Sequence, residues 1–111
     1  MQLNGWKEKQ LHTFNAAGDG VYPTPAVVFD AAGNLYGTTQ SGGALGQGAV
    51  FKLAPAGNGP WPETIIFSFD PNGSGGYAPA QGLTIDPAGH IYGTVIRGGA
   101  FSDGTAFEIM P

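Results

Sequence analysis

The sequence contains no cysteine, and it carries little charge of either sign. Without cysteine the chain has neither disulfides nor thiolate zinc sites to stabilise it. Four side chains are Lys or Arg and eight are Asp or Glu, which gives a formal net charge of −4. The cations, Lys7, Lys9, Lys52 and Arg97, form no basic patch. Because nucleic acids and anionic membranes are bound through such patches, we expect neither as a partner.

Long apolar runs are missing as well. No stretch approaches the ~20 apolar residues that a membrane helix needs, and residues 1–10 lack the apolar centre of a signal peptide. Glycine and proline interrupt every window that is long enough to show a helical period. The sequence therefore predicts a soluble protein without helices and leaves its compartment open.

Turn formers and bulky apolar residues are abundant instead. The 20 glycines and 9 prolines stand beside seven Phe, four Tyr and two Trp, and 41% of the residues are hydrophobic. This hydrophobic content argues against disorder, so we assign the glycines to tight turns between short strands. The composition predicts an all-β fold.

The chain contains one unit twice, a feature that usually decides the architecture. Residues 6–14 (WKEKQLHTF) align with residues 61–69 (WPETIIFSF) at a spacing of 55, and residues 23–55 align with residues 79–111 at a spacing of 56. In the longer block 13 of 33 positions are identical, mostly turn glycines and bulky apolar residues, which indicates a shared backbone rather than a shared catalytic site. The identical pairs are Pro23/Pro79, Asp30/Asp86, Ala32/Ala88, Gly33/Gly89, Tyr36/Tyr92, Gly37/Gly93, Thr38/Thr94, Gly42/Gly98, Gly43/Gly99, Ala44/Ala100, Gly48/Gly104, Phe51/Phe107 and Pro55/Pro111.

Short apolar runs between turn residues predict the strands of each unit. Four antiparallel strands in ~55 residues is the size of a β-propeller blade. The predicted strands are residues 26–30, 34–39, 49–54 and 63–69 in the first unit, and residues 82–86, 90–96 and 105–110 in the second.

The string DAAGNLYGTTQSGGALGQGAVFKL and its echo DPAGHIYGTVIRGGAFSDGTAFEI resemble the tandem GloVer repeat of bacterial, often surface-anchored, proteins. More loosely, the D-x-x-G-N-L-Y hairpin resembles the blades of NHL-type and streptogramin-lyase-type propellers. The resemblance covers nearly the whole chain. It implies a propeller fold and a secreted or cell-surface location, and it implies no particular activity.

The predicted strands suggest an assembly. Residues 1–111 are interpreted as one two-blade propeller unit, with an outer strand at residues 6–14, blade one at residues 22–69 and a three-stranded blade two at residues 77–111. Two blades cannot close a ring that typically has ~4 to 8 blades. We therefore expect a homo-oligomer in which each N-terminal strand completes the last blade of a neighbouring chain. A trimer is favoured, then a tetramer, then a dimer; a fragment of a longer propeller is the alternative.

Two tryptophans carry the binding hypothesis. Trp6 and Trp61 each precede an outer strand and are followed two residues later by Glu8 or Glu63. An aromatic face can stack on the CH face of a sugar while a carboxylate accepts hydrogen bonds from its hydroxyls. Small two-blade bacterial lectins that trimerise into six-blade rings offer an architectural parallel. The alternative, in which each Trp packs onto the neighbouring blade, is favoured by how often Trp is buried.

Each unit has a glycine-rich loop, residues 41–48 in the first and 97–104 in the second, and the second loop carries charged residues at two positions where the first does not. Arg97 and Asp103 stand where the first unit has Ser41 and Gln47, which could mark a site present once per chain; loop variation is the simpler explanation. Neither glycine-rich loop has the GK[ST] sequence or the following helix of a phosphate-binding loop.

No catalytic constellation is evident. His12 aligns with Phe67 and His90 with Asn34, so neither histidine recurs in the repeat, and we expect no catalytic residue, metal or cofactor. The sequence favours a non-enzymatic binding module for carbohydrate or another small polar ligand, multivalent through the ring. A structural or protein-interaction scaffold is the second hypothesis, and a propeller lyase or hydrolase is the third.

Overall fold

The computed structural model describes residues 2–3, 6–14, 21–23, 27–41, 46, 48–57, 59–69, 77–79, 83–97 and 104–110. All regular structure in these residues is β-strand, so the all-β prediction is confirmed. The strands are β1 (Gln2–Leu3), β2 (Trp6–Lys7), β3 (Val21–Pro23), β4 (Val28–Phe29), β5 (Leu35–Ser41), β6 (Ala49–Leu53), β7 (Glu63–Ser68), β8 (Tyr77–Pro79), β9 (Thr84–Ile85), β10 (Ile91–Arg97) and β11 (Thr105–Ile109).

Sheet one consists of β3 to β7, all paired antiparallel. β3 and β4 both pair with β5, β3 near its C-terminal end and β4 near its N-terminal end, so together they fill one strand position. β5, β6 and β7 follow in order, with a register shift between Val50 and Phe51 where β6 meets β7. The sheet therefore has four strand positions, in the order in which the chain visits them.

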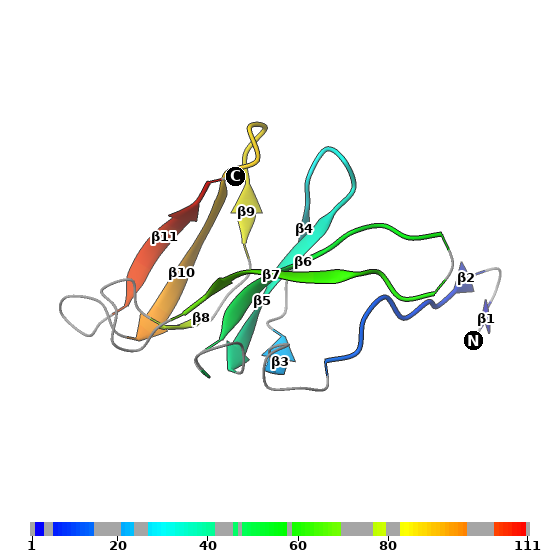
Figure 1. Cartoon of the computed structure of the whole chain (residues 1–111), viewed down its shortest axis with the longest axis horizontal. Coiled ribbons are helices and arrows are strands. Elements are labelled where there is room, and N and C mark those ends of the chain that lie inside the picture. The colour runs from blue at the N-terminus through cyan, green and yellow to red at the C-terminus, as the bar shows by residue number, and fades with distance from the viewer. Residues whose placement is uncertain are drawn as a thin grey trace.

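Sheet two consists of β8 to β11 and repeats three of these positions. β8 and β9 pair with β10 as β3 and β4 pair with β5, and β10 pairs with β11 as β5 pairs with β6. Among the described residues no strand pairs with the other edge of β11, the edge that corresponds to the β7 side of β6. Figure 1 shows sheet two beside sheet one, and residues 8–14, the N-terminal segment, on the opposite side of sheet one.

The contact between the two sheets, here called the seam, forms the larger hydrophobic core. Val50 of β6 and Phe69, which follows β7, are buried against three residues of sheet two. Phe69 lies edge-to-face against Phe107 with ring centroids 5.4 Å apart. Such aromatic pairs add about 0.5–1.5 kcal/mol beyond the area they bury. The buried sheet-two residues of the seam are Leu83, Ile91 and Val95.

A second core lies on the other face of sheet one. Leu35, Phe51 and Leu53 are buried there. The N-terminal segment covers them with Leu11 and Phe14, and Trp61 and Ile65 pack against the same cluster. Sheet one is therefore contacted on both faces, by sheet two on one and, over part of the other, by the N-terminal segment (Figure 1).

A glycine lies beneath a phenylalanine ring in each sheet. Gly37 pairs with Phe51 across β5 and β6, and Gly93 pairs with Phe107 across β10 and β11. A Cβ added to Gly37 would lie 2.7 Å from Cζ of Phe51, and one added to Gly93 would lie 2.6 Å from Cζ of Phe107. In each sheet the phenylalanine ring occupies the space that a side chain at the glycine position would need. This explains why the glycine–phenylalanine pair occurs in both units.

Two details differ from the sequence-based expectation. β3 and β8 are not among the predicted strands; each is three residues long and ends in proline, which is tolerated here since both strands lie at a sheet edge. The expected outer strand at residues 6–14 is strand only at Trp6–Lys7, where β2 pairs with β1. Residues 8–14 pair with no sheet edge in the described chain, because the side chains of this segment pack on the face of sheet one instead.

Candidate functional site

Each repeat unit contains a hairpin that is organised by one aspartate. In the first unit Oδ1 of Asp30 accepts hydrogen bonds from the backbone N–H groups of Ala32 and Asn34, both at 2.9 Å. Oδ2 accepts from Nδ2 of Asn34 and from the hydroxyl of Tyr36, again at 2.9 Å. Gly33 completes the turn with φ of 86°, in the left-handed region that glycine adopts without strain.

These hydrogen bonds shift the pKa values of both acidic groups. The side-chain amide of Asn34, followed by the Tyr36 hydroxyl and the turn N–H groups, lowers the pKa of Asp30 from 3.8 to about 2, against the opposing effect of burial. Burial and the hydrogen bond to Asp30 raise the pKa of Tyr36 to about 12. The pair therefore stays as carboxylate and neutral phenol across the physiological range, which suits a structural clamp rather than acid–base catalysis.

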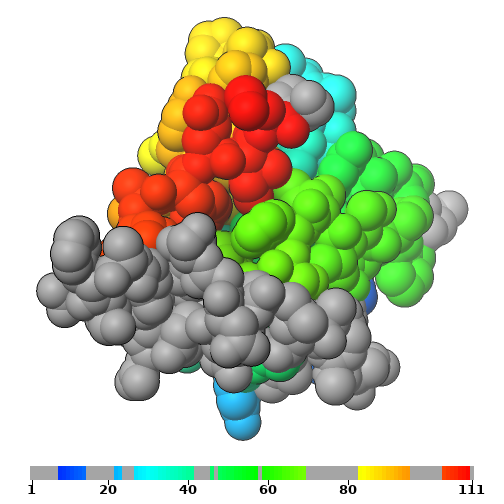
Figure 2. Space-filling model, turned by 60° about the vertical axis from the view of Figure 1, so that its left-hand side comes forward, coloured from blue at the N-terminus to red at the C-terminus, as the bar shows by residue number. Residues whose placement is uncertain are grey.

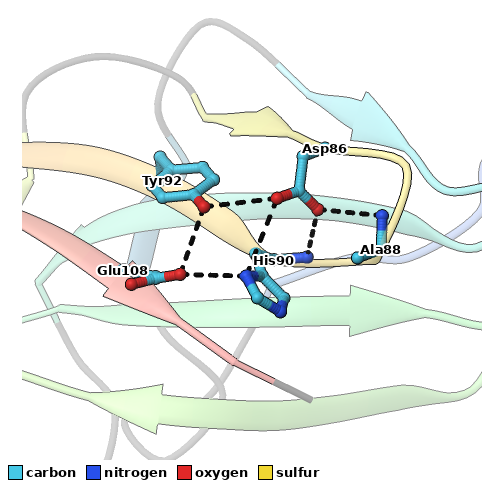
Figure 3. A network of polar contacts seen from close by, with 5 residues as sticks. All are labelled: Asp86, Ala88, His90, Tyr92 and Glu108. Carbon is cyan, nitrogen blue, oxygen red and sulfur yellow. Dashed lines mark hydrogen bonds and ion pairs between the residues drawn. The ribbon is translucent and has the colours of Figure 1, made fainter.

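The second unit replaces Asn34 by His90 and Lys52 by Glu108, and the network changes accordingly (Figure 3). The Tyr92 hydroxyl lies 3.2 Å from Oδ2 of Asp86 and 3.1 Å from Oε2 of Glu108. Nδ1 of His90 lies 2.9 Å from Oε2 of Glu108 and 3.7 Å from Oδ2 of Asp86. His90 thus contacts two carboxylates that the tyrosine also bridges.

The carboxylate of this second hairpin is also held in its ionised form. The backbone N–H of His90, at 2.8 Å from Oδ1, is the main cause that lowers the pKa of Asp86. Partial burial and the hydrogen bond to Glu108 raise the pKa of Tyr92 to about 12. The network has one histidine and two carboxylates, but no group of three His, Asp or Glu side chains in the described residues has an arrangement that could hold a metal ion.

A cavity of about 240 Å³ lies in the seam, between residues of sheet one and sheet two. Tyr36 and Lys52 are its polar side chains, and they are a directly opposed pair across β5 and β6. The rest of its wall is apolar side chain or glycine: Ile66, Gly89, Ile91, Ile109 and Met110.

The structure places Trp61 and Glu63 under the N-terminal segment. The backbone N–H of Trp61 donates to the carbonyl oxygen of Leu11 at 2.8 Å, and the half-buried indole packs with the second core. Its Nε1 is buried and has no hydrogen-bond partner among the described residues. Glu63 is 12% exposed and lies 3.3 Å from Nε2 of His12, a contact that the sequence did not predict.

Of the other four predicted site residues, three lie among the described residues. Trp6 lies in β2, and Glu8 is exposed just after it. Arg97 ends β10, and Asp103 lies outside the described residues. The ligand-binding prediction for these six residues therefore stays a prediction. The sequence did not predict the cavity beside Tyr36 and Lys52. The two units share identical residues at structural positions, whereas Lys52 has a different residue, Glu108, as its equivalent.

Comparison with known proteins identifies one family. A family model described as the Gloeobacter/Verrucomicrobia repeat matches residues 1–111. Searches among curated proteins and among solved structures find no match. Within the described residues there is also no helix that is long and apolar enough to cross a membrane.

Proposed function

The chain belongs to the Gloeobacter/Verrucomicrobia repeat family, and we propose that its two units are β-propeller blades whose ring acts as a multivalent, non-enzymatic binding module. Head-to-tail association of copies would build the ring. Three lines of support come from positions that the repeat makes equivalent: their burial, their ring contacts and their strand pairing.

Burial differs sharply between equivalent positions, and this observation carries the proposal. Leu83 is 5% exposed in the seam, whereas Val27, its equivalent in sheet one, is 48% exposed. Ile85 packs against the seam core, whereas its equivalent Phe29 is 55% exposed. Large exposed apolar groups at positions that are covered in the other unit mark a surface that a partner covers. The partner that fits is a sheet equivalent to sheet one, packed as in the seam.

Sheet two of another copy has the matching surface. In sheet one Val28, Tyr36 and Val50 face the seam. Their equivalents Thr84, Tyr92 and Ala106 are exposed, Tyr92 by 39%. Stacking this face of one copy on sheet one of the next would repeat the geometry of the seam between chains.

The N-terminal segment supplies the rest of that intermolecular seam. Leu11 and Phe14 are equivalent to Ile66 and Phe69, and both pairs pack on the next sheet along. The neighbouring rings repeat as well: His12 lies edge-to-face against Phe14, with centroids 4.6 Å apart, as Phe67 lies against Phe69 at 5.1 Å. The segment thus contacts sheet one as the end of a preceding blade would.

Strand pairing gives the register of the proposed contact. Within sheet one Glu63 pairs with Leu53 and Thr64 with Lys52. Transferred by the repeat, residues 8–13 would pair with the free edge of β11, with Glu8 opposite Ile109 and Lys9 opposite Glu108. Opposite charges at such a cross-strand pair contribute about 0.2–1 kcal/mol. This charge complementarity favours a second copy of this chain as the occupant of the edge.

A matched pair of substitutions tests the assembly. Phe29→Lys places a charge on the exposed surface of sheet one, and Ile85→Lys places it at the equivalent position inside the seam. Light scattering of the wild type should give a particle of about 34 or 45 kDa, three or four times 11.3 kDa. The Phe29→Lys variant should be monomeric by light scattering and folded by circular dichroism, whereas the Ile85→Lys variant should be unfolded. A wild-type chain that is folded and monomeric contradicts the proposal.

Binding of carbohydrate or another small polar ligand is the second part of the proposal. Each chain would contribute the same site to the ring, so weak individual sites would gain avidity on a multivalent surface. A glycan array, read with the wild type and Phe29→Lys, tests this: glycan binding that weakens when the ring is lost supports multivalent recognition. An assembled ring that binds no glycan and no small polar ligand would favour the alternative, a scaffold for a protein partner.

A further inference from the structure

Among the described residues that line the seam cavity, Lys52 is the only charged side chain. Lys52 is half-buried in the wall of the cavity, and no hydrogen bond or ion pair joins it to another described residue. Its equivalent in the second unit, Glu108, contacts both Tyr92 and His90. A partly desolvated ammonium beside apolar side chains gains more from a bound anion than an exposed lysine does.

We propose that this cavity binds a small hydroxylated carboxylate, of the class of a single uronic acid residue, with its carboxylate on Lys52. The inference rests on the proposed binding function and assigns it a site and a ligand class. Every described lining residue belongs to one chain, and in the proposed ring Glu8 of a neighbouring copy would pair opposite one of them, Ile109. Figure 2 shows the red surface of β11 meeting the green surface of sheet one.

The size and lining of the cavity select this ligand class. Ligand pockets for drug-sized molecules typically measure ~300–1,000 Å³, so a cavity of about 240 Å³ has room for one sugar ring. The aliphatic Ile66 and Ile91 side chains offer an apolar wall for the CH face of such a ring.

The tyrosine fixes the second polar contact. The Tyr36 hydroxyl donates its hydrogen to Asp30, which holds the ring in place and leaves the hydroxyl oxygen as an acceptor only. That oxygen can accept from a ligand hydroxyl but cannot donate to a ligand carboxylate. Lys52 donates and does not accept, so it takes the carboxylate. The two side chains together suit a ligand that has both groups.

The experiment compares two probes that differ at one carbon. Methyl β-glucuronide carries a carboxylate where methyl β-glucoside carries a hydroxymethyl group, and binding of both is measured by calorimetry and by ligand-observed NMR. We expect the glucuronide to bind about tenfold or more tightly than the glucoside, because a charge-assisted hydrogen bond is lost in the glucoside. Added salt should weaken the binding of the glucuronide and leave the binding of the glucoside unaffected.

Variants locate the site. Lys52→Met should lower glucuronide affinity about tenfold, whereas Lys52→Arg, which keeps the charge, should retain most of it. Equal affinity for the two probes, no binding of either, or an unchanged affinity in a folded Lys52→Met variant would each overturn the inference. Light scattering on the same samples separates the two proposals. An assembled ring that does not bind the glucuronide contradicts only the cavity proposal, and a monomer that binds it contradicts only the ring.

Discussion

Phe14 lies edge-to-face against Phe51 with ring centroids 5.0 Å apart, the arrangement that Phe69 makes with Phe107 at 5.4 Å. The two contacts are equivalent under the repeat. Phe14 is the last residue of the N-terminal segment, and Phe69 is the residue that follows β7. The N-terminal segment therefore contacts sheet one as sheet one contacts sheet two, and this equivalence supports the proposal that a blade begins in one copy and is completed in another.

The two phenylalanines should respond differently to truncation. Phe69 is 1% exposed, so Phe69→Ala should destabilise the folded chain by about 3–5 kcal/mol. Phe14 is half-buried, so Phe14→Ala should cost less in urea unfolding and should shift the oligomer toward monomer. Urea unfolding and light scattering on both variants check this. Equal losses of stability, with no change in mass for Phe14→Ala, would argue against the equivalence.

Charge exchange should test the strand register between copies. Lys9→Glu or Glu108→Lys alone would place like charges opposite each other in the proposed pairing and should weaken association several-fold, since such pairs are worth about 0.2–1 kcal/mol at each of several contacts. The double variant Lys9→Glu with Glu108→Lys should recover much of the loss. Sedimentation at several concentrations measures the association. Additive losses in the double variant would mean that these residues do not meet.

Periodicity and turn signals in the sequence were enough to predict the all-β class and the repeat. The D-x-x-G hairpins were readable because Asp30 and Gly33 act within four residues of each other. What lay beyond prediction depends on contacts between distant residues: the contact of His12 with Glu63 and the packing of Trp61 under Leu11. A tryptophan beside a carboxylate reads the same in sequence whether it faces a sugar or a neighbouring segment.

Acid should weaken the first hairpin over a defined pH range. The pKa of Asp30 is lowered from 3.8 to about 2 in the folded chain, so its contribution to stability is complete above pH 3.8 and is lost as the pH falls toward 2. Asp30→Asn cannot titrate, so the difference in stability between wild type and this variant should be largest above pH 4 and should shrink toward pH 2. Urea unfolding between pH 2 and 6 measures it. Tyr36→Phe removes one of the hydrogen bonds to Asp30 and should lose part of the same pH dependence, whereas a constant difference for Asp30→Asn would contradict the assignment.

Gly37 should be intolerant of even one added carbon. In a strand, Gly→Ala normally gains about 0.5–1 kcal/mol from reduced backbone entropy. Here the new Cβ would lie 2.7 Å from Cζ of Phe51, closer than non-bonded carbons come, and Phe51 is only 3% exposed, so its ring has little room to move. The steric cost of overpacking, about 1–3 kcal/mol, should exceed the entropic gain.

A double-mutant cycle isolates this clash from other effects of the substitution. Gly37→Ala should destabilise the chain, and adding Phe51→Leu should restore room for the Cβ, so the double variant should be more stable than the sum of the two single losses predicts. Gly57→Ala is the matched control, because no heavy atom lies within 4 Å of its added Cβ, and its stability should be unchanged or slightly higher. Urea unfolding of the four proteins gives the coupling energy. Purely additive losses for Gly37→Ala and Phe51→Leu would show that the ring does not occupy the glycine's space, and the recurrence of this Gly–Phe pair in both units would then need another cause.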